Sequence, residues 1–337
     1  MPTLRVDPLH PDPAVIARGA ELLRAGQLVA FPTETVYGLG AHALDPAAVQ
    51  RIYEAKGRPA FNPVIVHVAD TSEVGRVVAE WPEAAQRAAR AFWPGPLTLV
   101  LPKRPEVPDS ITAGLPTVAV RVPSHPVALA LLRASGVPIA APSANRYTEI
   151  SPTTARHVEK ALGDRVPLII DGGATTVGIE STVVDLTGPR PRLLRPGVLD
   201  PVSLEAVLGP LEGAPSPRRA DEARPGPGMI ERHYAPRARV LLVDASDARA
   251  VEAARLAVRE EEARGGLTFA LVRSGVELGT ARVTPMPAEA RDYARLLFAA
   301  LHDADDAGCT LLVVEQVPED GAWSGVHDRL KRAAAGG

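Results

Sequence analysis

The chain contains a single cysteine, Cys309, among its 337 residues. One thiol cannot close an internal disulfide, and it excludes a zinc site built from several cysteines. Cys309 opens the apolar run that ends at Val314, so we interpret it as an inert buried thiol and not as a nucleophile. The eight histidines show no H-x-x-x-H or similar spacing, so no protein-bound metal is expected.

Basic and aromatic residues are also scarce. The chain has only four lysines, so arginine supplies most of the positive charge; the formal net charge is −3, and aromatic residues make up 4%. A protein whose main partner is a nucleic acid needs a basic surface, and sites for single-stranded RNA combine basic with aromatic side chains. Direct nucleic-acid binding is therefore not expected to be the main role.

Long hydrophobic runs are missing as well. No stretch approaches the ~20 apolar residues that a membrane-spanning helix needs. The first residues, MPTLRVDPLHPDPAV, lack the apolar segment of a signal peptide. We therefore expect a cytoplasmic protein without a membrane partner.

The apolar residues that are present suffice for two cores. Domains average about 150 residues, so a chain of 337 residues is expected to form two. Hydrophobic residues make up 46% of the chain, which is enough for both. In residues 1–208, short apolar segments alternate with helical patterns, which predicts an α/β domain around one twisted sheet. The predicted strands are 28–31, 64–68, 97–101, 118–122, 139–141, 168–170 and 182–185, and the predicted helices include 13–24 and 47–55.

Proline and glycine become frequent after residue 208. Their density precludes regular structure, so residues 209–238, which contain His233-Tyr234-Ala-Pro236, are predicted to form a linker. The alternation of strands and helices then restarts, and it predicts a smaller Rossmann-like α/β domain over residues 239–337. Its predicted strands are 239–243, 267–272 and 310–315, and its predicted helices are 248–264 and 288–307.

The most informative motif, Pro32-Thr-Glu-Thr-Val-Tyr-Gly-Leu-Gly40, directly follows the predicted strand 28–31. It supplies two hydroxyls, a carboxylate and a phenol, and its Gly-x-Gly lets the backbone approach another group closely. A core strand rarely ends in so many small polar groups unless a ligand binds there. Polar clusters of the same type recur at Lys56-Gly-Arg58 with Asn62-Pro63, at Ser143-Ala-Asn145, and at Ser181-Thr182 with Arg195-Pro-Gly197. Together they predict an enzyme that acts on small molecules.

These clusters also have structural interpretations. Lys56-Gly57-Arg58 can be the basic, glycine-capped end of the predicted helix, although two cations on such a loop also suit a triphosphate. A histidine within an apolar strand, such as His67, is usually a core residue. Arg121 lies in the predicted strand 118–122, where a buried guanidinium needs an anion. That anion can be an internal carboxylate or the carboxylate of an amino-acid ligand.

Several familiar enzyme motifs are absent. Nothing matches G-x-x-x-x-G-K-[ST], so any ATP phosphates must be held by scattered cations and loop amides. Neither Ser143 nor Ser181 lies in G-x-S-x-G, which argues against a serine hydrolase. The segment from Gly38 to Ala43 fits a degenerate dinucleotide fingerprint, but so short a pattern is common by chance.

Taken in order, PTETVYGLG, KGRP with NP, SAN, GIESTVVD and RPG resemble the motifs of the YrdC family. The later PGMIERHYAP resembles the interdomain segment of the two-domain threonylcarbamoyl-AMP synthases. The resemblance covers residues 9–236 in motif detail and the remainder in size and pattern. It implies a YrdC-type twisted mixed sheet with helices, followed by the smaller C-terminal domain.

The resemblance also implies a reaction. The enzyme would condense L-threonine, bicarbonate or CO2, and ATP into threonylcarbamoyl-AMP, with release of pyrophosphate. Other proteins would then transfer the threonylcarbamoyl group to an adenosine of tRNA. Mg²⁺ is expected to accompany ATP, held mostly by phosphate and water. Two alternatives are a carbamoyltransferase that forms carbamoyl-adenylate from carbamoyl phosphate, and a module that binds structured RNA.

Roles for individual residues follow from the same resemblance. Lys56 and Arg58 are the predicted catalytic cations. The linker pair His233-Tyr234 is expected to fold back as a lid, because exclusion of water would protect a mixed anhydride. The threonine site would comprise Thr35, His67, Arg121 and Ser181. ATP would contact Arg58, Asn62, Thr117, Ala141, Ser143, Ser151, Arg195, His233 and Tyr234.

Overall fold

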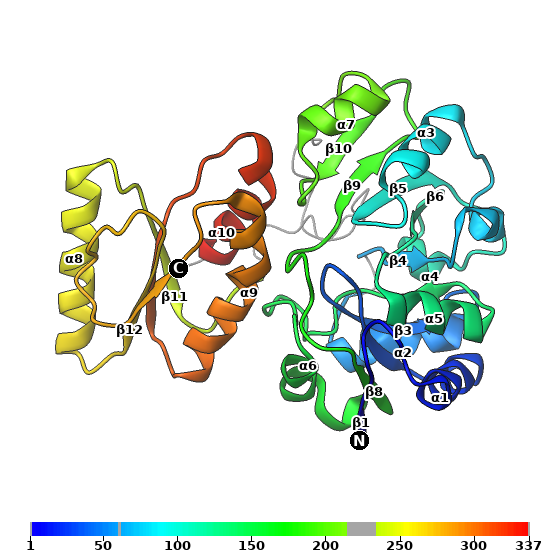
Figure 1. Cartoon of the computed structure of the whole chain (residues 1–337), viewed down its shortest axis with the longest axis horizontal. Helices are drawn as coiled ribbons and strands as arrows, with labels where there is room; N and C mark the ends of the chain where they lie inside the picture. Colours follow the sequence, from blue (N-terminus) through cyan, green and yellow to red (C-terminus); the bar gives the residue numbers. More distant parts are fainter. Residues whose placement is uncertain (1, 60–61, 214–233, 336–337) are drawn as a thin grey trace.

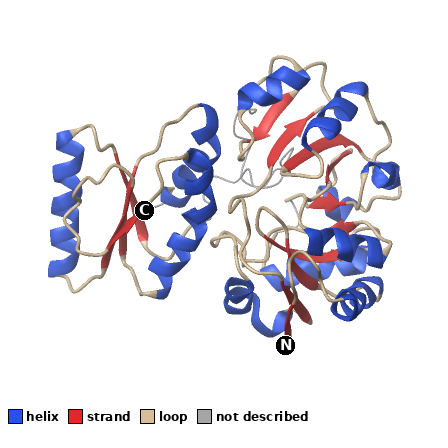
Figure 2. Cartoon of the chain, viewed as in Figure 1, coloured by secondary structure: helices blue, strands red, loops and turns tan. Residues whose placement is uncertain are grey.

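The computed structural model describes residues 2–59, 62–213 and 234–335. Their strands form two separate sheets, one of ten strands and one of four (Figures 1 and 2). The last helix of the larger part ends at Leu208, and the first strand of the smaller part begins at Arg239. Most of the predicted linker between these two points, including His233, lies outside the described residues.

The larger part contains ten strands and seven α-helices among its described residues. The strands are β1 (Thr3–Arg5), β2 (Val29–Pro32), β3 (Tyr37–His42), β4 (Ile65–His67), β5 (Leu97–Pro102), β6 (Thr117–Arg121), β7 (Ile139–Ala140), β8 (Leu168–Asp171), β9 (Thr182–Asp185) and β10 (Arg192–Arg195). The helices are α1 (Pro13–Arg24), α2 (Pro46–Lys56), α3 (Glu83–Phe92), α4 (Asp109–Thr112), α5 (Pro126–Ser135), α6 (Ala155–Leu162) and α7 (Pro201–Leu208).

The ten-stranded sheet is mixed, with the strand order β1-β8-β2-β3-β7-β4-β6-β5-β9-β10. Successive side chains of a strand face opposite sides of the sheet. Val29 and Phe31 of β2 accordingly enter the core under α1 and α5, whereas Ala30 enters the core under α2, α3, α6 and α7. A mixed sheet with helices on both faces is what the YrdC resemblance implies, so this part of the predicted fold is confirmed.

Three helices of the larger part begin with the same Asp-Pro pair. The side chains of Asp12, Asp45 and Asp200 each accept a hydrogen bond from the backbone N–H two residues later, and proline occupies the first helical position of α1, α2 and α7. Aspartate satisfies a donor that the helix leaves unpaired, and proline has no N–H to satisfy. The predicted start of α1 at Pro13 therefore matches the structure.

Strand β3 was not predicted, because the sequence places a ligand-binding loop there. β3 pairs with β2 on one side and with β7 on the other. An added Cβ at Gly40 would lie 2.7 Å from Phe31 Cε1 and 2.9 Å from Ile139 Cγ2. Gly40 therefore makes room for core side chains, and this glycine does not serve the close approach of a ligand.

The smaller part forms a four-stranded parallel sheet in the order β11-β14-β12-β13. Its core residues divide between α8 on one face and α9 with α10 on the other, which confirms the predicted Rossmann-like α/β class. The short strand β13 and the helix α10 were not predicted. The elements are β11 (Arg239–Val243), α8 (Ala248–Ala263), β12 (Thr268–Val272), β13 (Val283–Pro285), α9 (Ala290–Asp306), β14 (Leu311–Glu315) and α10 (Ser324–Ala334).

Helices α9 and α10 lie between the small sheet and the larger part (Figure 1). Val36, Ile150 and Ile179 of the larger part join the hydrophobic core that these helices form. The contact is close, since an added Cβ at Gly178 would lie 2.5 Å from a carbonyl oxygen of α9. Over the residues that the structure covers, no helix has both the length and the apolar character that crossing a membrane requires.

Candidate functional site

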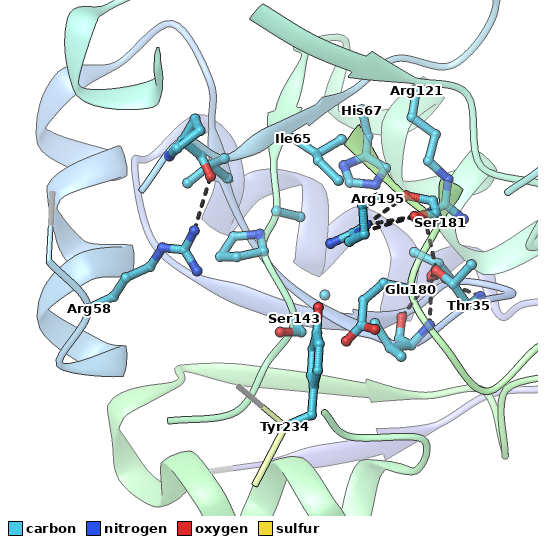
Figure 3. Close-up of a pocket in the computed structure, with 17 residues that line it drawn as sticks. Thr35, Arg58, Ile65, His67, Arg121, Ser143, Glu180, Ser181, Arg195 and Tyr234 are labelled. Atoms are coloured by element: carbon cyan, nitrogen blue, oxygen red, sulfur yellow. Dashed lines mark hydrogen bonds between the residues drawn. The ribbon is translucent and has the colours of Figure 1, made fainter. Parts of the chain in front are cut away.

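A pocket opens where the strands of the large sheet end in the motifs that the sequence analysis identified (Figure 3). Its atom-free space, counted out to the open mouth, is about 560 Å³. Strands β4, β6 and β10, the loops after β2 and β7, and the segment before β9 contribute to the wall. The lining residues are Thr33, Thr35, Val36, Gly38, Arg58, Pro63, Val64, Ile65, His67, Arg121, Ala141, Pro142, Ser143, Glu180, Ser181, Arg195 and Tyr234.

The predicted threonine-site residues, Thr35, His67, Arg121 and Ser181, all line this pocket and gather on one side of it (Figure 3). His67 and Arg121 are direct neighbours in the pairing of β4 with β6. The pairing register therefore fixes two of these residues relative to each other.

Arg121 has an internal carboxylate partner. Its guanidinium lies 2.6 Å from Glu34 Oε1, and the side chains of both residues are almost fully buried. The guanidinium also donates to Thr35 Oγ1 at 3.0 Å and to the Gly95 carbonyl oxygen at 3.1 Å. The internal ion pair, which the sequence left as an alternative, is therefore present. The same guanidinium holds Thr35 at the pocket wall.

His67 is a buried imidazole at this end of the pocket. Burial, and then the neighbouring charge of Arg121, lowers the pKa of His67 from 6.5 to about 3. The imidazole is therefore neutral at pH 7. Its Nδ1 atom has no hydrogen-bond partner among the described residues. Because a buried polar atom is normally hydrogen-bonded, this atom is a candidate contact for a ligand.

Ser181 and Arg195 form one hydrogen-bonded unit. Arg195 donates from Nε and NH2 to the Ser181 carbonyl oxygen, at 3.1 and 2.8 Å, and from NH2 to Ser181 Oγ at 3.1 Å. Ser181 Oγ also shares a hydrogen bond of 2.8 Å with Thr98 Oγ1. Burial lowers the pKa of the Arg195 guanidinium. Figure 3 shows Arg195 between the predicted threonine residues and Arg58.

Arg58 lines the opposite side of the pocket (Figure 3). The turn at Gly57, whose φ is +62°, ends α2 and leads the chain into Arg58. The guanidinium donates to the Pro63 carbonyl oxygen at 3.0 Å, and its Nε has no partner among the residues described. Burial is the main cause that lowers its pKa. Ala141, Ser143 and Tyr234, which the sequence assigns to ATP, also line the pocket.

Lys56 does not line the pocket, although the sequence pairs it with Arg58 as a catalytic cation. Its Nζ donates to the carbonyl oxygens of Ser143 (2.6 Å) and Asn145, so it holds the Ser-Ala-Asn loop in place. Burial, and then the charge of Arg58, lowers the pKa of Lys56 well below its ordinary value. The catalytic role of Lys56 stays a prediction, and its visible contacts are structural.

Three other ATP-site candidates, Asn62, Thr117 and Ser151, are not on the pocket wall. Asn62 donates from Nδ2 to Tyr147 Oη at 2.9 Å. Ser151 Oγ donates to Glu180 Oε1, beneath the pocket wall. Thr117 begins β6, at the opposite end of that strand from Arg121. His233 lies outside the described residues.

Two carboxylates near the pocket were not assigned roles from the sequence. Glu34 lies inside the first motif and pairs with Arg121. Glu180 lies inside GIESTVVD, lines the pocket and pairs with Arg329 of α10. The motifs contain both glutamates, so their positions could have been noted, but nothing in the sequence around Arg329 points to the pocket. No group of three or more metal-ligating side chains occurs in the part of the chain that the structure describes.

The mixed sheet and this pocket define a YrdC-type α/β enzyme that binds small molecules at the ends of its strands. Residues 21–197 match the family model described as telomere recombination, which groups Sua5, YciO and YrdC proteins, and residues 200–335 match the model for the C-terminal domain of threonylcarbamoyl-AMP synthase. The chain belongs to the threonylcarbamoyl-AMP synthase family.

Individual relatives agree with the family models. The threonylcarbamoyl-AMP synthase of Pyrococcus abyssi is 46% identical over 94% of this chain and 92% of its own length. The Bacillus subtilis enzyme is 41% identical over 98% of this chain and 96% of its own length. The crystal structure of P. abyssi Sua5 complexed with L-threonine superposes with a TM-score of 0.92 at 42% identity, covering 99% of this chain and 98% of that one.

The YciO structure of E. coli matches with a TM-score of 0.53 at 29% identity, over 58% of this chain and 96% of that protein. The predicted family and enzyme class are therefore confirmed, and the full-length relatives support threonylcarbamoyl-AMP synthesis over the carbamoyltransferase and RNA-binding alternatives.

Proposed function

We propose that this pocket condenses L-threonine, bicarbonate or CO2, and ATP into threonylcarbamoyl-AMP and pyrophosphate. The observation that carries the proposal is the division of the pocket into two chemically different sides. One side, here called the threonine end, consists of Thr35, His67, Arg121 and Ser181. The other, here called the phosphate end, consists of Arg58, Ser143 and Tyr234, and Arg195 lies between the two ends.

The threonine end suits a small zwitterion. Hydroxyls and a guanidinium can bind a carboxylate, and the charge of Arg121 is partly offset by Glu34. His67 is neutral at pH 7, so its imidazole does not repel an ammonium group, and its Nδ1 is available for a hydrogen bond to the substrate. A relative with 42% identity has been crystallised with L-threonine, which supports this choice of substrate.

The phosphate end suits the transfer of an adenylyl group. A carbamate oxygen must attack the α-phosphorus in line, while the negative charge on the departing pyrophosphate is neutralised. Arg58 and Arg195 are the cations that face this part of the pocket. Their burial strengthens their interaction with an anion, because water does not screen a buried charge.

Mg²⁺ is proposed to arrive with ATP. The pocket carboxylate, Glu180, is already hydrogen-bonded by Ser151 and Arg329, and the described residues contain no metal-binding cluster. A cation held by the protein therefore does not fit this site. Mg²⁺ commonly binds through phosphates and keeps several waters, which is compatible with a pocket that offers no carboxylate cage.

The product is an activated mixed anhydride, so a second protein that transfers its acyl group must use it. We propose that the threonylcarbamoyl-transfer machinery acting on tRNA is that partner, as the family resemblance implies. The proposed synthesis does not require tRNA to bind in this pocket.

The experiment is to incubate the full-length chain with ATP, Mg²⁺, bicarbonate and threonine, and to measure pyrophosphate and threonylcarbamoyl-AMP by mass spectrometry. Pyrophosphate release should require threonine. Release that instead requires carbamoyl phosphate would favour the carbamoyltransferase. Tight RNA binding with a steep salt dependence, and no threonine-dependent release, would favour the RNA-binding module.

A further inference from the structure

Arg329 of α10 reaches from the C-terminal domain to the wall of the pocket. Its side chain is 0% exposed, although arginine is almost never fully buried unless it is paired. Its Nε donates to Glu180 Oε2 at 2.8 Å, and NH1 donates to the Pro196 carbonyl oxygen at 3.0 Å. A second carboxylate, Asp328, lies 2.8 Å from NH1.

The same guanidinium also lies against Tyr234. Its central carbon is 5.1 Å from the centre of the Tyr234 ring, which is within the range of a cation–π contact. Phe298 of α9 also packs near that ring, with the two ring centres 5.5 Å apart. Tyr234 has a φ of +62°, a backbone conformation that a bulky residue adopts only when its surroundings impose it.

Glu180 and Tyr234 both line the pocket, and Arg329 touches both of them. Glu180 belongs to the segment before β9, and Tyr234 belongs to the predicted linker 209–238, ahead of β11. These two residues are 54 positions apart in the chain. Both contact Arg329, which lies outside the sequence motifs that contain Glu180 and Tyr234. Arg329 of the C-terminal domain therefore connects the two parts of the pocket wall that carry Glu180 and Tyr234.

Two close backbone contacts hold α9 and α10 beside this arginine. An added Cβ at Gly178 would lie 2.5 Å from the Ala294 carbonyl oxygen, and one at Gly325 would lie 2.3 Å from the Gly197 carbonyl oxygen. Gly178 and Gly197 flank Glu180 and Arg195 in the sequence. The docking surface is thus formed by the two segments that carry pocket residues, so a shift of α10 would be transmitted to the pocket.

We propose that Arg329 is a positioning residue for threonylcarbamoyl-AMP synthesis, which orients Glu180 and Tyr234 at the pocket and thereby makes the C-terminal domain part of the substrate site. This inference rests on the proposed function. Arginine suits the role because its planar guanidinium can donate to carboxylate and carbonyl oxygens at its edge while its face lies on an aromatic ring. Lysine has a single ammonium group and cannot keep all of these contacts.

The test compares Arg329→Met with Arg273→Met in the full-length chain. Arg273 is a matched control because it also pairs with a buried glutamate, Glu315 at 3.7 Å, and lies over an aromatic ring, Trp323 at 5.5 Å. All three of these control residues belong to the C-terminal domain and none lines the pocket. Both variants should lower the melting temperature, but only Arg329→Met should alter catalysis.

For Arg329→Met we expect kcat/KM for threonine to fall by about 10-fold or more, because contacts that stabilise the transition state are lost. Arg273→Met should keep the wild-type value. Arg329→Lys should fall between wild type and Arg329→Met, and it provides the catalytic measurement if the methionine variant does not fold. The double variant Glu180→Gln, Arg329→Met should lose less than the product of the two single losses, because residues that act through one contact are not additive.

Equal activity of Arg329→Met and wild type would overturn the inference. So would equal losses in Arg329→Met and Arg273→Met, or independent losses in the double variant, since each would indicate a general effect on folding. A wild-type chain that shows no threonine-dependent pyrophosphate release would contradict the proposed function instead, so the two failures are distinguishable.

Discussion

The two ends of the pocket are built in different ways. At the threonine end, His67 and Arg121 face each other across paired strands, and Arg121 is tied to Glu34, Thr35 and Gly95. At the phosphate end, Arg58 and Ser143 lie on loops, and Tyr234 belongs to the predicted linker. Strand pairing and the buried Arg121–Glu34 ion pair fix the first end, whereas the second is assembled from segments that approach from different directions. Substitutions should therefore affect folding and threonine binding at the first end, and turnover at the second.

The largest effect is expected for Arg121→Ala. It removes the partner of buried Glu34, and breaking a buried ion pair from one side destabilises a protein by about 3–5 kcal/mol. Threonine binding should be lost with it, while binding of an ATP analogue should persist in the folded fraction. Calorimetric titration with each ligand, alongside urea unfolding, measures both effects.

The matched control for that prediction is Arg121→Ala combined with Glu34→Gln. Removing the charge of both partners should restore part of the stability without restoring threonine binding. If the folded Arg121→Ala variant binds threonine like wild type, Arg121 is structural only and the assignment of the threonine end is wrong.

At the phosphate end, Arg58→Ala should reduce turnover by about 100-fold, because a preorganised cation at a phosphoryl-transfer centre is lost. Its guanidinium donates to the carbonyl oxygen of Pro63 and has no buried carboxylate partner among the described residues, so the loss of stability should be smaller than for Arg121→Ala. Steady-state kinetics and thermal unfolding of the same preparation measure the loss of turnover and the loss of stability. A drop in melting temperature with unchanged turnover would instead indicate a helix-end residue without a catalytic role.

Lys56→Met sharpens the comparison because the sequence and the structure lead to different expectations. An exposed cation at a helix end would contribute about 0.3–1 kcal/mol. Lys56 is instead buried and donates to the carbonyl oxygens of Ser143 and Asn145. Leaving such acceptors unsatisfied should cost about 1–3 kcal/mol. Turnover should fall as well, since the loop carries Ser143. Urea unfolding with no measurable change in stability would show that these contacts are not important.

The smallest effect near neutral pH is expected from His67, because its contribution to stability changes only as the pH falls below about 6.5. Its pKa is about 3 in the folded chain and near 6.5 in the unfolded chain, so the unfolded state binds the proton first as the pH falls. The contribution of His67 is fully present above pH 6.5 and is lost as the pH falls toward 3, by at most about 1.4 kcal/mol per pH unit. Denaturation at several pH values should give a smaller slope for His67→Asn than for wild type; identical slopes would contradict the buried, neutral state of His67.

Much of the fold could be predicted from the sequence because its signals are local. The start of α1 at Pro13 follows from Asp12, and strand β11 coincides with the predicted segment 239–243. Elements with weak local signals were missed. β3 contains two glycines, which are poor strand formers, and β13 is a three-residue edge strand of the small sheet. Tertiary pairing, and not local preference, decides whether such segments become strands.

The candidate site was likewise predictable in part from local sequence and in part only from the tertiary structure. The sequence by itself determined which motifs gather, since the polar groups that follow strands of one sheet meet at the ends of those strands. Only the tertiary structure decided what each side chain contacts: Arg121 with Glu34, Lys56 with two carbonyl oxygens, and Arg329 with Glu180, 149 positions away. Buried charges select partners by distance and desolvation within the packed molecule. Those distances arise only when the sheet has formed and α10 has docked against it.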